Sequence, residues 1–181
     1  MCLIAFAWCR HPRYRLILAA NRDELYARPA DPMHWWPDRP GVLAGRDLQA
    51  GGTWLAVSRG GRLATVTDFR EDFRVHTDKR SRGELVTGFV DGERAPLEYA
   101  RDIDGDRYAG FSLLVAADDS LACVDQAAVT PRASSLSAID GLSNATLDTP
   151  WPKLRRTRDA LADMIDEDAV NPAALFRLLA D

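Results

Sequence analysis

Short apolar runs separated by turn residues dominate the first part of the chain. Residues 2–8 and 14–20 are two such runs, and both are rich in strand-forming side chains. We expect each to be a buried strand, and the polar turn around Pro12 to join them into a hairpin. The polar tetrapeptide Asn-Arg-Asp-Glu, residues 21–24, follows directly. A hairpin would place position 21 or so opposite position 2, and therefore bring this tetrapeptide close to Cys2.

Two further pairs of strands are expected downstream, at residues 53–58 with 62–67 and at 111–117 with 121–125. Gly60-Gly61 is a strong signal for a tight turn within the first pair. The segment 27–41 contains four prolines, so we expect it to be irregular, and Trp35 and Trp36 to pack it against the body of the protein. Residues 70–81 are highly charged and predict an exposed loop.

Helices are predicted at residues 83–90, 97–102, 151–165 and 172–180. Ser81 is expected to cap the first helix in a capping box with Glu84. Thr149 is expected to cap the third helix, and Asn171 the last. Strand pairs followed by helices predict an antiparallel α+β domain with helices covering sheets.

The composition narrows the classes of function. A chain of 181 residues with a formal net charge of −4 has room for one domain with a sizeable core and gives no reason to expect nucleic-acid binding. No apolar stretch approaches the roughly 20 residues of a membrane span, and the first run is too short for a signal peptide. Three sparse cysteines without a Cys-x-x-Cys pair argue against disulfides and a structural metal site. We therefore expect a cytoplasmic protein.

Cys2 is the first candidate for chemistry. Cleavage after Met1 would leave cysteine at the N-terminus, where one residue supplies both a nucleophile and a base. The α-amine has a pKa of about 8, near enough to neutrality to accept the thiol proton. The alternative is that Cys2 is a small buried hydrophobe at the start of a strand.

Four polar segments could surround such a nucleophile. Asp23 could orient the ammonium or the thiol, and Arg22 could bind a substrate carboxylate. Asp68 ends a predicted strand, and Asn144 lies in a small polar segment where its amide could donate to an oxyanion. Gly51-Gly52 would let the backbone pass close to another group. Each of these segments could equally be an ordinary turn.

The order of these segments resembles the NRDE family, also called the Transport and Golgi Organisation Protein Two-like family. The resemblance runs from residue 1 to about residue 155. It rests on Met-Cys-Leu-Ile at the start, Leu16-Ile-Leu-Ala-Ala-Asn-Arg-Asp-Glu24, Arg28-Pro29, Gly51-Gly-Thr-Trp-Leu55, Ser81-Arg-Gly-Glu-Leu85, Gly141-Leu-Ser-Asn144 and Thr149-Pro-Trp151. Members of the family are generally longer, so the chain is expected to lack a C-terminal portion.

The resemblance implies a four-layer αββα sandwich of two antiparallel sheets, as in N-terminal-nucleophile cysteine hydrolases. It implies that Cys2 attacks a small carbon–nitrogen amide, that Asp23 positions Cys2, and that Asn144 contacts the oxyanion or substrate. Asn21, Arg22, Asp68 and Arg82 would bind substrate. Asp68 stands where the family usually has Asn, and an ionised carboxylate would repel a developing oxyanion.

The family is also linked to haem trafficking and to acyl-coenzyme A metabolism, which implies an alternative function. The same pocket would then carry haem or an acyl-coenzyme A without catalysis, and no cofactor would be required for turnover. Arg22, Arg28 and Arg82 would bind propionates or phosphates. Cys9 and His11 would be candidate haem ligands. A third possibility is an inactive fragment whose exposed sheet edge is hidden in a homodimer.

Overall fold

The computed structural model describes residues 2–69, 79–125, 128–133 and 138–180. Within these ranges the chain divides into two compact units. Unit 1 combines Met1–Asp23 with Ser134–Asp181, and unit 2 is the continuous segment Glu24–Ala133. The first unit is therefore assembled from the two ends of the sequence.

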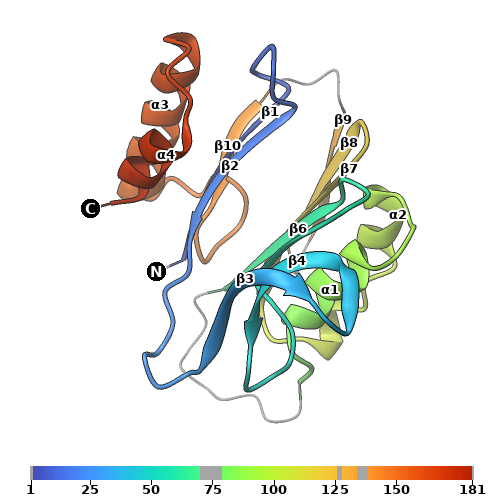
Figure 1. Ribbon diagram of the computed structural model, residues 1–181. Helices are drawn as coiled ribbons and strands as arrows, with labels where there is room; N and C mark the ends of the chain where they lie inside the picture. The colour runs from blue at the N-terminus through green and yellow to red at the C-terminus, as the bar shows by residue number, and fades with distance from the viewer. Residues whose placement is uncertain (1, 70–78, 126–127, 134–137, 181) are drawn as a thin grey trace. The chain divides into compact units, whose positions relative to one another are not determined.

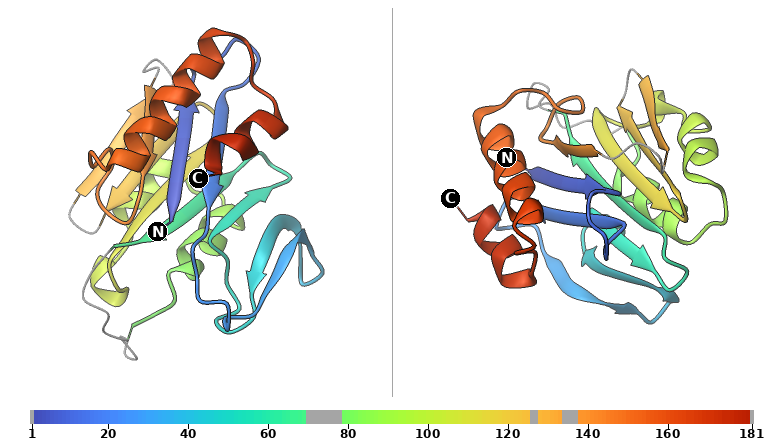
Figure 2. Two further views of the ribbon diagram at one scale, coloured as in Figure 1. Left: turned by 90° about the vertical axis from the view of Figure 1, so that its left-hand side faces the viewer. Right: turned by 90° about the horizontal axis from the view of Figure 1, so that it is seen from above.

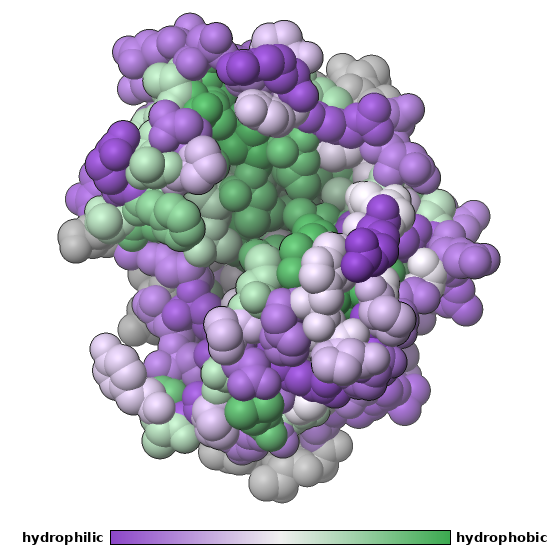
Figure 3. All heavy atoms as spheres, in the orientation of Figure 1, coloured by the Kyte–Doolittle hydropathy of each residue, from purple (hydrophilic) through white to green (hydrophobic). Residues whose placement is uncertain are grey.

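Unit 1 is a three-stranded antiparallel sheet in the order β10-β1-β2, with β1 at Leu3–Trp8, β2 at Leu16–Asn21 and β10 at Ala138–Leu142. Helices α3 (Pro152–Asp166) and α4 (Pro172–Leu179) cover one face of this sheet (Figures 1 and 2). Ala5 and Ala7 of β1 pack there against Leu161 and Ile165 of α3. Burying a leucine or isoleucine stabilises the fold by about 1.5 to 3 kcal/mol. Charged residues occupy the outer side of α3, which is hydrophilic in the upper left of Figure 3.

The predicted hairpin of the first two strands is confirmed, and its register pairs Leu3 with Asn21. All six residues of β1 are buried, as expected for the central strand. The prediction that the second strand is equally buried is wrong, because in β2 buried residues alternate with partly exposed ones. An edge strand has a neighbour on one side only, and this exposes part of its side chains.

Unit 2 is a seven-stranded antiparallel sheet in the order β3-β4-β5-β6-β7-β8-β9. Helices α1 and α2 cover one face of it (Figures 1 and 2). The bounds are β3 Ala30–Trp36, β4 Arg39–Asp47, β5 Leu55–Ser58, β6 Leu63–Asp68, α1 Gly83–Val90, α2 Pro96–Arg101, the 3-10 turn Gly105–Arg107, β7 Phe111–Ala117, β8 Ser120–Asp125 and β9 Ala128–Ala133. Phe89 of α1 and Leu113 of β7 are fully buried members of its core.

The proline-rich segment 27–41 is not irregular as expected, because it forms β3 and the start of β4. Strand β3 lies at the edge of the sheet, where a proline such as Pro32 does not interrupt a ladder on both sides. Trp36 does pack into the core and donates its indole N–H to the Ala44 carbonyl at 3.2 Å. Trp35 remains 42% exposed and stacks under Arg59 at 3.9 Å instead. Strands β9 and β10 were not predicted.

The four helices are confirmed, and the three predicted caps have different outcomes. Arg82 occupies the N-cap of α1, but the Ser81 hydroxyl accepts from the Gly83 N–H at 3.3 Å, as a capping side chain would. The capping box is wrong, because Glu84 pairs with Arg80 instead. Trp151 occupies the N-cap of α3, two residues after Thr149. Asn171 does cap α4, since its side-chain oxygen accepts from the Ala174 N–H at 2.9 Å.

The α+β class with two antiparallel sheets is confirmed, while the four-layer stacking and the single domain stay predictions. Most of the charged loop at 70–81 lies outside the described residues. None of the helices in the described residues is long and apolar enough to span a membrane.

Candidate functional site at the end of the three-stranded sheet

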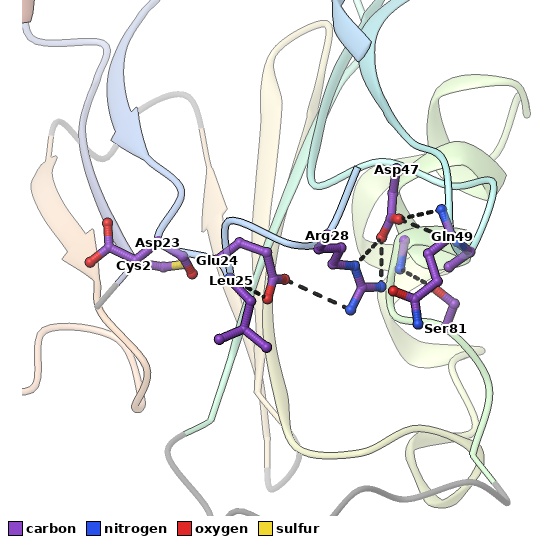
Figure 4. A network of polar contacts seen from close by, with 10 residues as sticks. Cys2, Asp23, Glu24, Leu25, Arg28, Asp47, Gln49 and Ser81 are labelled. Atoms are coloured by element: carbon purple, nitrogen blue, oxygen red, sulfur yellow. Dashed lines mark hydrogen bonds and ion pairs between the residues drawn. The ribbon is translucent and has the colours of Figure 1, made fainter. Parts of the chain in front are cut away.

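Cys2 lies at the open end of β1, one residue before the ladder begins. It is partly exposed, and its sulfur lies 3.7 Å from the backbone carbonyl oxygen of Asp23 (Figure 4). Side chains alternate along a strand, so Cys2 shares the sheet face of Ile4 and Phe6, opposite the face that Ala5 and Ala7 present to α3. The thiol is therefore not part of the packing between sheet and helices.

Residues from both neighbouring strands flank Cys2. Leu3 pairs with Asn21 on β2, and Ile4 pairs with Leu142 on β10. The described ladders end at these pairs, so Arg22 directly follows β2 and Asn144 lies two residues beyond β10. If both registers continued, Arg22 and Asn144 would lie on either side of Cys2, and we expect these three residues to lie close together at the end of the sheet.

Ser143 holds the backbone of Cys2 in place. Its hydroxyl donates to the Cys2 carbonyl oxygen at 2.9 Å, and the serine is only 1% exposed. Asn144 follows with a positive φ of 51°, which is not a strand conformation. Asparagine tolerates this left-handed conformation better than most residues. Local spacing does not single out Ser143, because its partner lies 141 residues away.

Gly141 lies at a position that has no room for a side chain. A Cβ at this position would lie 2.3 Å from Leu154 Cδ1 and 2.9 Å from the Ile4 carbonyl oxygen. Asp148 holds the same glycine from the other side: its Oδ1 accepts from the Gly141 N–H, and its own N–H donates to the Gly141 oxygen, both at 2.9 Å. Arg158 of α3 pairs with Asp148 at 3.0 Å. Strand β10 is therefore held by its ladder with β1 on one side and by the contacts of Gly141 and Asp148 with α3 on the other.

The other predicted site residues are arranged differently. The Asn21 amide donates to the Leu179 carbonyl at 3.4 Å, which ties β2 to the end of α4. Asp68 and Arg82 belong to unit 2, where Asp68 ends β6 and Arg82 donates to the Gly110 carbonyl at 3.0 Å. The Phe69 N–H donates to the same oxygen. Asp68 and Arg82 thus share one end of the β6–β7 pair, and their part in substrate binding stays a prediction.

Comparison with known proteins places the whole chain in one family. The family model described as Transport and Golgi organisation 2 matches residues 1–181. The bovine Transport and Golgi organization protein 2 homolog is 39% identical over 197 residues, covering 99% of this chain and 71% of its own length. The mouse and human homologs are each 34% identical, covering 95% of this chain and 67% of their own length. The chain belongs to the Transport and Golgi organisation 2 family.

A second group of residues builds a polar network in unit 2 (Figure 4). Arg28 binds Asp47 Oδ2 through Nη2 at 2.6 Å and through Nε at 2.9 Å, and Glu24 approaches Arg28 at 3.8 Å. Asp47 Oδ1 accepts from the backbone N–H groups of Gln49 and Ala50. Asp47 and Glu24 therefore already engage Arg28, which makes it a poor site for a haem propionate or a phosphate.

Burial alone would raise the pKa of Asp47, but the hydrogen bond from Arg28 and those from the backbone hold this pKa below its usual value. The hydrogen bond to Asp47 in turn raises the pKa of Arg28. Both shifts favour the ionised forms of Asp47 and Arg28. The network fastens residues 24–28 to the turn that follows β4.

Two glycine-containing segments meet in the same unit. A Cβ on Gly52 would lie 3.0 Å from the backbone of Gly83, and one on Gly83 would lie 2.9 Å from the Thr53 nitrogen. The Gly51-Gly52 segment and the start of α1 thus pack backbone against backbone. The expectation of a close backbone approach at Gly51-Gly52 is confirmed, and the partner is α1.

Both ring nitrogens of His11 have hydrogen-bond partners within the protein. Its Nε2 lies 3.2 Å from Asp168 Oδ1, its Nδ1 accepts from the Arg13 N–H at 3.1 Å, and its side chain is 1% exposed. The His11 and Arg13 contacts lower the pKa of Asp168. Haem ligation through Nε2 would displace Asp168, and ligation through Nδ1 would displace the Arg13 N–H. Among the described residues, no group of three or more His, Cys, Asp or Glu side chains could hold a metal ion.

Proposed function

We propose that this family member is an N-terminal-nucleophile hydrolase that cleaves a small carbon–nitrogen amide through Cys2. The observation that carries the proposal is a partly exposed Cys2 at the end of the central strand, with its sulfur 3.7 Å from the Asp23 carbonyl oxygen. Arg22 and Asn144 follow the two neighbouring strands, and continuing the ladder registers would bring a cation and an amide donor to this nucleophile. A thiol that only filled space would need neither polar neighbour.

The reaction would begin after removal of Met1, which lies outside the described residues. The freed α-amine takes the thiol proton, and the Cys2 thiolate attacks the amide carbonyl carbon. The carbonyl electron pair moves onto oxygen, where the Asn144 amide would donate a hydrogen bond. Collapse of this intermediate breaks the carbon–nitrogen bond, and the leaving nitrogen takes the proton from the α-ammonium. Water then hydrolyses the Cys2 thioester and restores the thiol.

Asp23 and Arg22 would have separate roles. The Asp23 backbone carbonyl already contacts the Cys2 sulfur, and its carboxylate would orient the α-ammonium. Arg22 would bind a carboxylate on the substrate, since a guanidinium matches a carboxylate with two parallel hydrogen bonds. The proposal therefore favours acidic amides, such as N-acyl amino acids, over neutral ones.

The test compares two partly exposed thiols of unit 1, Cys2 and Cys9. Protein whose loss of Met1 has been verified by intact mass is treated with an acyl thioester and with a panel of N-acyl amino acids. We expect one acyl adduct at Cys2 in the wild type and in Cys9→Ser. We expect no adduct and at least a 1000-fold lower turnover in Cys2→Ala.

Turnover that survives in Cys2→Ala would end the hydrolase proposal. A parallel titration with hemin separates the carrier alternative. A saturable Soret shift in Cys2→Ala, with no turnover in the wild type, would favour a carrier over an enzyme.

A further inference from the structure

We infer that Ser143 is a positioning residue for Cys2, an inference that rests on the proposed function. The Ser143 hydroxyl donates to the Cys2 carbonyl oxygen at 2.9 Å from a site that is 1% exposed. A buried hydroxyl without a partner costs free energy, so this bond also decides where the serine side chain points. The bond links the residue after β10 to the residue before β1.

The position of Cys2 in the ladder explains why this bond matters. The pairing of β1 with β2 begins at Leu3, and its pairing with β10 begins at Ile4. Once Met1 is removed, Cys2 becomes the first residue of the chain, and terminal residues fray unless other contacts hold them. The Ser143 bond extends the ordered backbone by the one residue that carries the nucleophile.

Holding the Cys2 carbonyl sets the rotation about its Cα–C bond. That rotation determines where the other two substituents of Cα, the α-amine and the side chain that carries sulfur, lie relative to the sheet. The nucleophile and its base are both on this one carbon. A single hydrogen bond to the carbonyl therefore orients both groups of the proposed reaction.

Ser143 is itself held on a rigid support. Gly141, two residues earlier, has no room for a Cβ against Leu154 and is bonded on both sides by Asp148. The Arg158–Asp148 pair anchors this arrangement to α3. Functional groups are held best when the residues that support them belong to packed helices and strands. The Gly-Leu-Ser-Asn motif thus combines a close approach at Gly141, a positioning hydroxyl at Ser143 and a proposed oxyanion donor at Asn144.

The test measures the rate of Cys2 alkylation by iodoacetamide against pH, in protein that has lost Met1 and carries Cys9→Ser. An activated Cys2 has a midpoint below the value of about 8.5 for an ordinary thiol. We expect Ser143→Ala to slow Cys2 alkylation at pH 7 about 10- to 100-fold and to move the midpoint toward that ordinary value. Ser143→Thr, which keeps the hydroxyl, should restore at least part of the rate.

Thr157 supplies the matched control. It is another buried hydroxyl of unit 1, and it donates to the Lys153 carbonyl at 3.0 Å within α3. Thr157→Val also removes one buried hydrogen bond, so it should lower thermal stability while leaving the Cys2 profile unchanged. A purely structural role for Ser143 would make Ser143→Ala behave like Thr157→Val.

The outcomes separate this inference from the proposed function. An activated wild-type profile that Ser143→Ala leaves unchanged overturns the role of Ser143 and leaves the proposed function standing. An ordinary wild-type profile overturns the proposed function, and the positioning role with it. A shift in Ser143→Ala that Thr157→Val does not share supports both.

Discussion

The polar residues singled out in the sequence have different surroundings in the two units. In unit 1 they lie near a thiol, whereas in unit 2 they hold backbone segments together. In unit 1, Cys2 is partly exposed between residues that follow β2 and β10. In unit 2, Arg28 is bound to Asp47, and Gly52 packs against Gly83. The tetrapeptide at 21–24 itself crosses this boundary, because Glu24 belongs to unit 2 and pairs with Arg28. The polar residues of unit 2 thus have structural partners, whereas those of unit 1 lie around the nucleophile of the proposed reaction.

The largest expected effect comes from the two tight glycine positions. Gly141→Ala would place a methyl group 2.3 Å from Leu154 Cδ1 and 2.9 Å from the backbone oxygen of Ile4. We expect this overpacking to lower the free energy of unfolding by about 3 kcal/mol in urea denaturation. Gly83→Ala in unit 2 meets backbone atoms of Thr53 and Gly52 and should cost a similar amount.

The two variants differ in their effect on Cys2. Under conditions where each remains folded, Gly141→Ala should also slow Cys2 alkylation, and Gly83→Ala should not. Gly41→Ala is the control, since a Cβ there has nothing within 4 Å. Equal loss of Cys2 reactivity in the Gly83 and Gly141 variants would contradict the division of roles.

The next effect concerns the Arg28 network. Arg28→Ala leaves the buried Asp47 carboxylate without its strongest partner, so we expect the free energy of unfolding to fall by about 2 kcal/mol. Arg94→Ala breaks an ion pair whose two side chains are 63% and 60% exposed, and it should cost no more than about 0.5 kcal/mol. Similar losses from the two variants would show that the Arg28 network is no more than a surface contact.

The same network predicts a pH dependence. Asp47 has a pKa below its ordinary value in the folded state, so its ionised form stabilises the fold above the pKa of the unfolded chain. This contribution is lost as pH falls through the folded-state pKa. The difference in unfolding free energy between wild type and Asp47→Asn should therefore be on the order of 1 to 2 kcal/mol at pH 7 and shrink below about pH 4. A difference that grows toward low pH would reverse the assigned sign.

The smallest effect is expected at the last helix of unit 1. Asn171→Ala removes the oxygen that accepts from the Ala174 N–H, and loss of such a cap costs about 1 kcal/mol. Urea denaturation measures this loss, and Cys2 alkylation should not change. Asn171→Asp retains the acceptor and should retain the stability. A loss in Asn171→Asp as large as that in Asn171→Ala would rule out the cap as the cause.

Local patterns predicted most of the elements. The hairpin of β1 and β2, the four helices and the Asn171 cap follow from short-range signals: apolar runs, turn residues and a capping side chain. The β3–β4 hairpin was missed because prolines normally indicate loops, and the sequence does not say that β3 is an edge strand. Strand β10 was missed because only its pairing with β1, more than 130 residues away, makes residues 138–142 a strand.

The candidate site shows the same limit. The nearness of Cys2 to Asp23 could be predicted, since a hairpin needs only the two strands and the turn between them. Three other features depend on β10 and could not be predicted from sequence spacing. They are the Ser143 hydrogen bond to Cys2, the Asp148 hydrogen bonds to Gly141 and the positive φ of Asn144. In the sequence, Arg28 is a candidate ligand-binding residue. Its actual partner, the Asp47 carboxylate, lies 19 residues along the chain, and no local pattern indicates this ion pair.

The discontinuity of unit 1 has a consequence for synthesis on the ribosome. Unit 2 is one continuous segment and can complete its sheet as soon as residue 133 has emerged. The β1–β2 hairpin is made first but must wait for residues 138–179 before its third strand and both covering helices exist. An isolated hairpin is marginally stable in water. The nascent chain can therefore fold from its middle outward, and the end that carries Cys2 is ordered last.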